Sequence, residues 1–136
     1  MAEVFVDANV FIRHLTQDHP VQSPKATAFL ARIERGEFRA RTADTVIFET
    51  VFTLERHYRE TKHVIRDALV PLIELPGILL SGKKRLRRAF ELYADRNMSF
   101  GDACHVAVME QYGITEIASF DKDFDRVPGI TRVEPN

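Results

Sequence analysis

Cysteine is nearly absent from this sequence of 136 residues, in which Cys104 is the only one. No disulfide can form within the chain, so we expect it to occupy a reducing compartment. One cysteine and five scattered histidines also cannot supply the ligands of a zinc finger. A secretory leader pattern is missing at the N-terminus, and no apolar run approaches the length of a membrane span. We therefore expect a cytoplasmic protein with no membrane partner.

An excess of charge of either sign is also missing. The chain has 19 Lys and Arg against 20 Asp and Glu, a net charge of -1. A protein that binds nucleic acid through its whole surface is strongly basic, so any such surface here must be local. The chain has one basic run, and as the start of a helix it would place several cations where the helix dipole disfavours positive charge. The run either contacts RNA backbone or forms a solvated face. Its cations are Lys83, Lys84, Arg85, Arg87 and Arg88.

The length suits a single domain that spans residues 1–136. Short apolar runs at 4–6, 78–80 and 115–119 predict strands, and stretches of helical periodicity lie between them. Ser23 followed by Pro24 predicts the start of one helix, and Ser99 and Gly113 predict the two ends of another. Strands that alternate with helices predict an α/β fold, a three-layer αβα sandwich with a short, mostly parallel central sheet.

Acidic residues stand where such a sheet binds its ligands. Asp7 follows the first predicted strand, and Asp121 and Asp123 follow the last well-defined one. Asp102 lies near the start of a helix, and Glu49 lies early in another. Ligands of open α/β sheets bind beyond the carboxyl ends of the strands. We therefore expect the acids of four distant segments to converge at one end of the sheet.

Such a convergence requires a cation. Two carboxylates 4 Å apart repel by about 4 kcal/mol at an effective dielectric near 20. Several of them share a pocket in the ionised form only when a positive charge joins them. Hard divalent cations with oxygen ligands meet this need, and magnesium is the usual choice in phosphate chemistry. The sequence therefore predicts a site for Mg²⁺ or Mn²⁺.

Each strand-end or helix-start acid also has a purely structural interpretation. Asp7 can cap the helix that follows its strand. Ser99 and Asp102 have the spacing of a capping box, although a capping carboxylate can also bind metal. Asp121 and Asp123 fit an ordinary turn.

Glu49 is the predicted site residue that the helical periodicity supports least. Ile47, Val51 and Leu54 mark the centre of the apolar face of the helix, and Glu49 falls well away from it. Glu55 falls near that centre, and a buried Glu55 would need a partner such as an arginine. Periodicity alone therefore leaves Glu55 as an alternative to Glu49.

The four acidic segments, taken in order, resemble the PIN domain, and more narrowly the toxin subunit of VapBC toxin–antitoxin modules. The resemblance extends from Val4 to about Val133 and implies a PIN-like fold with metal-assisted hydrolysis of RNA phosphodiester bonds. The segments are Asp7-Ala-Asn9, Glu49 with Leu54-Glu-Arg56 after it, Ser99-Phe-Gly-Asp102-Ala, and Ser119-Phe-Asp121-Lys-Asp123-Phe124.

The resemblance also implies roles for individual residues. It favours Glu49 over Glu55 as the helical acid of the site. It implies RNA as the substrate, an antitoxin protein that inserts a cation at the acidic site, and a homodimer. The implied catalytic residues are Asp7, Glu49, Asp102 and Asp121, the metal ligands Asp7, Asp102, Asp121 and Asp123, and the supporting residues Asn9 and Ser119.

Three other functions share some features with this set of residues. An aspartate-based phosphatase or hydrolase of the haloacid dehalogenase type also has an acid after its first strand, but Asn9 stands where its second acid belongs. A receiver domain would need adjacent acids after that strand, which the sequence lacks. The third alternative is a catalytically weak RNA-binding module on the PIN scaffold, and the complete set of acids argues against it.

Overall fold

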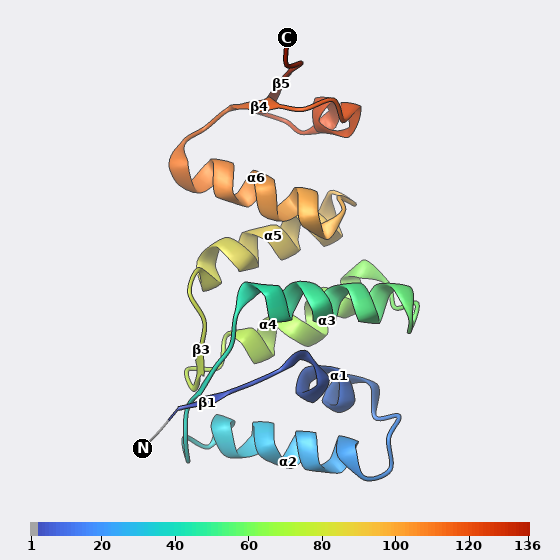
Figure 1. Cartoon of the computed structure of the whole chain (residues 1–136), viewed down its shortest axis with the longest axis vertical. Coiled ribbons are helices and arrows are strands. Elements are labelled where there is room, and N and C mark those ends of the chain that lie inside the picture. The colour runs from blue at the N-terminus through green and yellow to red at the C-terminus, as the bar shows by residue number, and fades with distance from the viewer. Residues whose placement is uncertain (1–2) are drawn as a thin grey trace.

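The structure, a computed structural model that describes residues 3–136, is elongated, with the two ends of the chain at opposite ends of the molecule (Figure 1). None of the helices among these residues has the length and apolar character needed to cross a bilayer. The elements in order are β1 (Val4–Phe5), α1 (Ala8–Thr16), α2 (Gln22–Glu34), β2 (Ala40–Arg41), α3 (Asp44–Arg56), α4 (Lys62–Ile73), β3 (Ile78–Leu79), α5 (Lys83–Asp95), α6 (Phe100–Tyr112), β4 (Glu116–Ala118), the 3-10 helix η1 (Lys122–Arg126) and β5 (Thr131–Val133).

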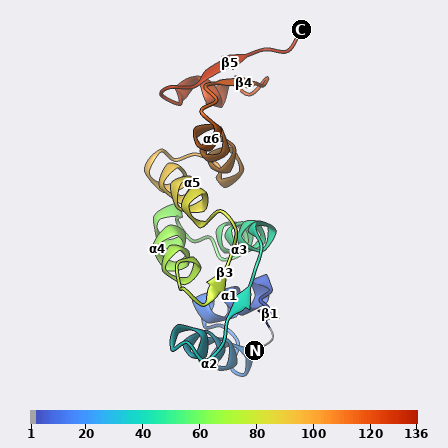
Figure 2. The same cartoon turned by 90° about the vertical axis from the view of Figure 1, so that its left-hand side faces the viewer.

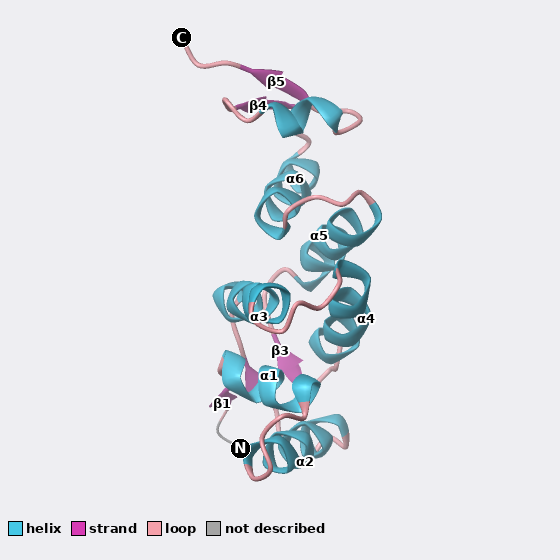
Figure 3. Ribbon diagram, turned by 90° about the vertical axis from the view of Figure 1, so that its right-hand side faces the viewer, coloured by secondary structure: helices cyan, strands magenta, loops and turns pink. Residues whose placement is uncertain are grey.

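The strands form two separate parallel sheets. One has the order β1-β2-β3, in which Val4 pairs with Ala40 and Ala40 with Ile78. The other joins β4 to β5 and pairs Glu116 with Thr131. Figures 2 and 3 show the two sheets at different levels of the molecule, with α5 and α6 between them. The predicted α/β class with short parallel strands is confirmed, with the difference that the strands do not form one continuous sheet.

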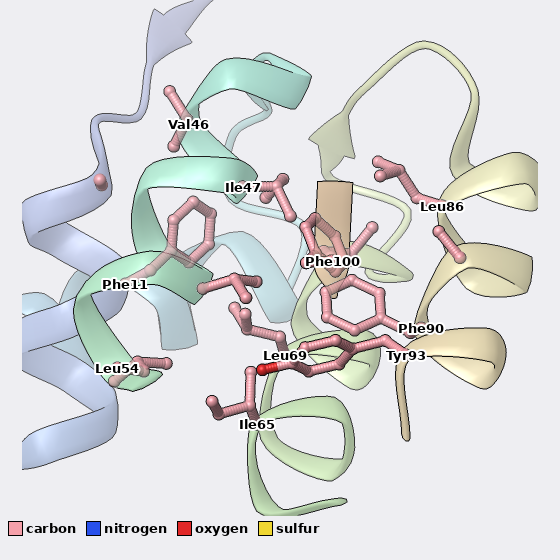
Figure 4. Packing of buried hydrophobic residues seen from close by; sticks show 14 of the residues in the cluster. Phe11, Val46, Ile47, Leu54, Ile65, Leu69, Leu86, Phe90, Tyr93 and Phe100 are labelled. Carbon is pink, nitrogen blue, oxygen red and sulfur yellow. The ribbon is translucent and has the colours of Figure 1, made fainter. Parts of the chain in front are cut away.

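The hydrophobic core lies mainly in residues 3–98, which we call the core body. Phe100, the first residue of α6, is inserted into this core (Figure 4). Its ring centroid lies 4.8 Å from that of Phe90 and 5.4 Å from that of Tyr93, in the tilted and edge-on arrangements that aromatic rings favour. The start of α6 is therefore fixed to the core body.

The second helix begins at Gln22, two residues earlier than predicted, so the assignment of Ser23 as its N-cap was wrong. His19 takes over the role of acceptor, because its Nδ1 accepts the Gln22 N–H at 2.9 Å. The Ser23 hydroxyl instead accepts the His19 N–H at 3.2 Å. Pro24 remains in the first turn, where its missing N–H costs no helical hydrogen bond.

Both predicted ends of α6 are confirmed. The Ser99 hydroxyl accepts the Asp102 N–H at 3.2 Å, which caps the helix. Gly113 ends it at φ 66°, a left-handed conformation that glycine adopts without steric cost. The chain then continues into residues 114–136, which we call the C-terminal arm and which hold β4, η1 and β5.

Candidate functional site

Three of the five predicted acids meet in the structure. Asp102, Asp121 and Asp123 each offer a carboxylate oxygen, and these oxygens lie within 4.8 Å of one another. Asp102 lies in the first turn of α6, whereas the other two belong to the C-terminal arm, at the start of η1. We call these three residues the acidic cluster. The predicted meeting of a helix start with a strand end is therefore present.

Short polar contacts fix the main chain of the acidic cluster. The Ser119 hydroxyl accepts the Asp121 N–H at 3.0 Å, and Asp121 Oδ1 in turn accepts the Asp123 N–H at 2.9 Å. Side chains that accept a nearby N–H in this way hold turns and helix starts in one conformation. Together with the cap from Ser99, these bonds set the backbone positions from which the three carboxylates project.

The other predicted site residues lie apart from the acidic cluster. Asp7 is exposed and caps α1, because its Oδ1 accepts the Ala8 N–H at 2.8 Å. Asn9 follows on the same helix, and Glu49 is exposed on α3. The predicted convergence of all the acids therefore does not occur within this chain. The physical reason is the divided sheet, since β4 does not pair with β1.

Glu55 does not occupy the buried position that periodicity gave it. It is exposed, and it accepts a hydrogen bond from the Tyr93 hydroxyl. Burial, together with this hydrogen bond, raises the pKa of Tyr93. The partner of Glu55 is therefore a tyrosine from the core and not an arginine.

A cleft of about 520 Å³ adjoins the acidic cluster and mixes both signs of charge. Asp102 and Asp123 line it, together with Arg88, Arg96 and Arg126. Arg126 Nη2 donates to Asp123 Oδ1 at 3.2 Å. Arg96 and Arg126 were not among the site residues predicted from the sequence. The only signal for Arg126 was its position three residues after Asp123, within one helical turn.

The basic run at the start of α5 is largely neutralised by partners on neighbouring elements. Glu74 pairs with Arg87, and Glu110 with Arg88. Lys83 Nζ donates to the Leu75 carbonyl at 2.9 Å, and Arg85 Nη1 donates to the Gln111 side chain at 2.9 Å. Lys84 is exposed. These contacts favour the interpretation of the run as a solvated face, with Arg88 as the member that also reaches the cleft.

Comparison with known proteins identifies the family of this chain. Residues 4–130 match the PIN domain family. The chain belongs to the PIN domain family. The haloacid dehalogenase and receiver alternatives are thereby set aside.

Individual relatives of this PIN domain are toxins and ribonucleases by name. The chain is 28% identical over 133 residues to VapC ribonuclease Mb1869c of Mycobacterium bovis and to Ribonuclease VapC13 of Mycobacterium tuberculosis. Each match covers 96% of this chain and 98% of the relative. Among solved structures, the chain is similar to Mycobacterium tuberculosis VapC20, a sarcin-ricin loop cleaving toxin. That match has 23% identity and a TM-score of 0.44, and it covers 98% of this chain and 100% of the other.

Proposed function

We propose that this PIN domain is an endoribonuclease of the VapC toxin type, which hydrolyses RNA phosphodiester bonds with Mg²⁺ or Mn²⁺. The single observation that carries the proposal is the acidic cluster, whose carboxylate oxygens lie within 4.8 Å of one another. Like charges at such distances repel unless a cation joins them. Membership of the PIN family and the VapC relatives support the same function.

The donor set of the acidic cluster fits a hard divalent cation. All three donors are carboxylate oxygens, and no sulfur or imidazole nitrogen belongs to the group. Magnesium and manganese prefer such ligands, whereas softer metals select thiolate or imidazole. A cation held there supplies Lewis acidity, which activates water and neutralises charge on the phosphate.

The residues of the chain have separate tasks in this proposal. Asp102, Asp121 and Asp123 bind the cation, and Asp7 and Glu49 complete the acidic site. Ser119 orients the main chain of Asp121, and Asn9 supports Asp7. Both supporting roles keep carboxylates in fixed positions, which polar contacts in the outer shell of a metal site commonly do.

Arginines beside the acidic cluster provide the contact to RNA. Arg88, Arg96 and Arg126 line the same cleft as Asp102 and Asp123. Guanidinium groups bind phosphate oxygens through paired hydrogen bonds. A phosphodiester in this cleft would therefore lie within reach of both these cations and the acids Asp102 and Asp123. Unpaired RNA loops fit best, because their backbone can bend into a cleft.

The proposal includes an antitoxin partner and a homodimer. An antitoxin segment that places an arginine or lysine at the acidic cluster would neutralise it and compete with the metal. Its binding would therefore inhibit RNA cleavage.

Cleavage of RNA by matched variants tests this function. Full-length protein is incubated with structured and single-stranded RNA in Mg²⁺, in Mn²⁺ or in EDTA. We expect cleavage only with metal, and a fall of about 100-fold or more in Asp121→Asn, as for other electrostatic groups that act on the transition state. The control is Glu116→Gln, which changes an exposed acid of β4 in the C-terminal arm that belongs neither to the acidic cluster nor to the lining of the cleft.

The outcomes separate an enzyme from a binding module. Cleavage by Asp121→Asn at the rate of the wild type, or cleavage in EDTA, would contradict the proposal. Binding of RNA without any cleavage would favour the catalytically weak module instead.

A further inference from the structure

The two sheets leave matching edges open. In β1, the Val6 N–H donates to the Arg41 carbonyl at 2.8 Å, so Val4 and Val6 face β2. Backbone groups of alternate residues point to opposite sides of a strand. The N–H and C=O of Phe5 therefore point to the side of β1 on which residues 3–136 place no other strand.

The edge of β4 is open in the same way. The Ser119 N–H donates to the Val133 carbonyl at 3.0 Å, and the Thr115 carbonyl accepts the Thr131 N–H at 2.8 Å. Thr115 and Ser119 thus face β5, and by alternation Glu116 and Ala118 present their backbone groups to the open side. Open edges with free N–H and C=O groups are places where another strand adds.

The C-terminal arm is too exposed for an isolated sheet. No residue of β4 or β5 is buried. Parallel sheets are normally covered on both faces, and two strands alone are marginally stable in water. Apolar side chains are exposed in both sheets, with Phe5 of β1 at 59% and Val133 of β5 at 39% of full exposure. Both sheets therefore have apolar surface that a second sheet could bury.

The β4 strand of the same chain is held away from β1. Phe100 fixes the start of α6 to the core body, and α6 packs along α5 (Figures 1 and 3). Only residues 113–115 connect α6 to β4, a span of roughly 10 Å at full extension. The strand could reach β1 of its own chain only if α6 left α5. A second copy of the chain meets no such obstacle.

We propose that two copies of this chain exchange their C-terminal arms, so that β4 of each copy pairs in parallel with β1 of the other. This proposal rests on the ribonuclease function proposed above and specifies how its site is completed. Each core body would then carry a continuous sheet in the order β3-β2-β1-β4-β5, with the last two strands from the partner. Exchange of identical elements is a low-cost route to a symmetric dimer.

The exchange would assemble the acids that a single chain keeps apart. The carboxyl ends of parallel strands meet at one edge of a sheet. Asp7 comes shortly after β1, and Asp121 comes shortly after β4. In the exchanged dimer, Asp7 of one copy therefore stands beside the acidic cluster of the other. Each of the two sites is built from both copies.

A mixing experiment tests the shared site. Asp7→Asn and Asp121→Asn each remove one half of it, so each homodimer is inactive. When the two variants are unfolded together and refolded at equal concentration, half of the dimers are mixed. One of the two sites in a mixed dimer is intact, so we expect about a quarter of the wild-type activity. No recovery, while the wild type cleaves RNA, would overturn the exchange and leave the ribonuclease function standing.

A second measurement does not depend on activity. The chain has a mass of 15.6 kDa, and we expect light scattering to give twice this value for the wild type. Ala118→Pro removes an N–H on the open edge of β4 without touching the bonds to β5, and we expect a monomer. Ala118→Val keeps the N–H and should remain a dimer.

Phe5→Pro makes the same deletion on β1, and circular dichroism verifies that each variant is folded. A monomeric wild type, or a dimer that survives both proline substitutions, would overturn the exchange. If the wild type is a dimer that both prolines dissociate but it does not cleave RNA, then the ribonuclease function fails and the exchange stands.

Discussion

The core body and the C-terminal arm differ in how they are stabilised. The core body surrounds a cluster of buried aromatic and aliphatic side chains, whereas the strands of the arm bury none of their residues. The arm is held instead by polar contacts, chiefly Arg132, which pairs with Asp125 and Glu134 and donates to the Ser119 carbonyl. The acidic cluster belongs mostly to the arm. Stability and chemistry therefore lie largely in separate parts of this chain.

Removal of the aromatic anchor should produce the largest loss of stability. Phe100→Ala would leave a cavity among Phe90, Tyr93 and Phe48, and we expect it to cost about 3–5 kcal/mol. Phe120→Ala is the control, because Phe120 is 72% exposed and its loss should change stability by less than about 0.5 kcal/mol. Urea unfolding measures both. Equal effects would contradict the assignment of Phe100 as the residue that fixes α6 to the core body.

Hydrogen exchange compares the two regions directly. Amides of the core, such as those of Ile47 and Leu69, should exchange only through global unfolding. In a dilute monomeric sample, the amides of β4 and β5 should exchange at least about 100-fold faster, because their sheet can open locally. Protection of β4 that rises with protein concentration would support the exchange of arms. Strong protection in the monomer would contradict the weak packing of the arm.

Loss of a helix cap should have a smaller effect. Ser99→Ala removes the acceptor for the Asp102 N–H, and we expect it to lower the free energy of unfolding by about 1 kcal/mol. Ser99→Asp keeps an acceptor and should restore most of this loss. Because Asp102 lies in the turn that Ser99 caps, the alanine variant should also weaken Mn²⁺ binding. Unchanged metal affinity in a destabilised protein would separate the cap from the site.

The smallest expected effect on stability is a dependence on pH that arises from one carboxylate of the core body, Asp18. The Tyr58 hydroxyl, and after it that of Thr16, hydrogen-bond to Asp18 and lower its pKa from the usual 3.8 to about 2. A lowered folded-state pKa means that ionised Asp18 stabilises the fold above about pH 4 and loses this effect toward pH 2. Asp18→Asn should therefore flatten the acid unfolding curve between these values. An unchanged slope would contradict the low pKa.

The sequence was sufficient for those features that depend on local patterns. The Ser99 cap, the Gly113 terminus and the parallel strands follow from residue preferences along one segment, and each is confirmed. The start of α2 was missed because a histidine, which is an uncommon cap, supplies the acceptor. Local signals are therefore reliable where the side chain that decides the structure is of a type commonly found at that position.

The assembly of the acids could be predicted only in part. Asp121 and Asp123 meet Asp102 because residues 113–119 lead back over the start of α6. The position of Asp7 relative to this cluster depends on which strands pair across the chain, and strand partners cannot be read from periodicity. Asp7 and Glu49 are therefore proposed as site residues on the resemblance to the PIN domain, and the structure of one chain leaves them apart from the acidic cluster.

The acidic cluster is proposed to be a site for a divalent cation, and a direct measurement of metal binding tests this proposal. The free Mn²⁺ signal in electron paramagnetic resonance is titrated with the wild type, with Asp102→Asn and with the control Glu116→Gln. We expect the wild type and the control to bind Mn²⁺, and Asp102→Asn to bind it at least about tenfold more weakly, since one of three carboxylate ligands is lost. Equal affinity in all three proteins would contradict the assignment of the acidic cluster as the metal site.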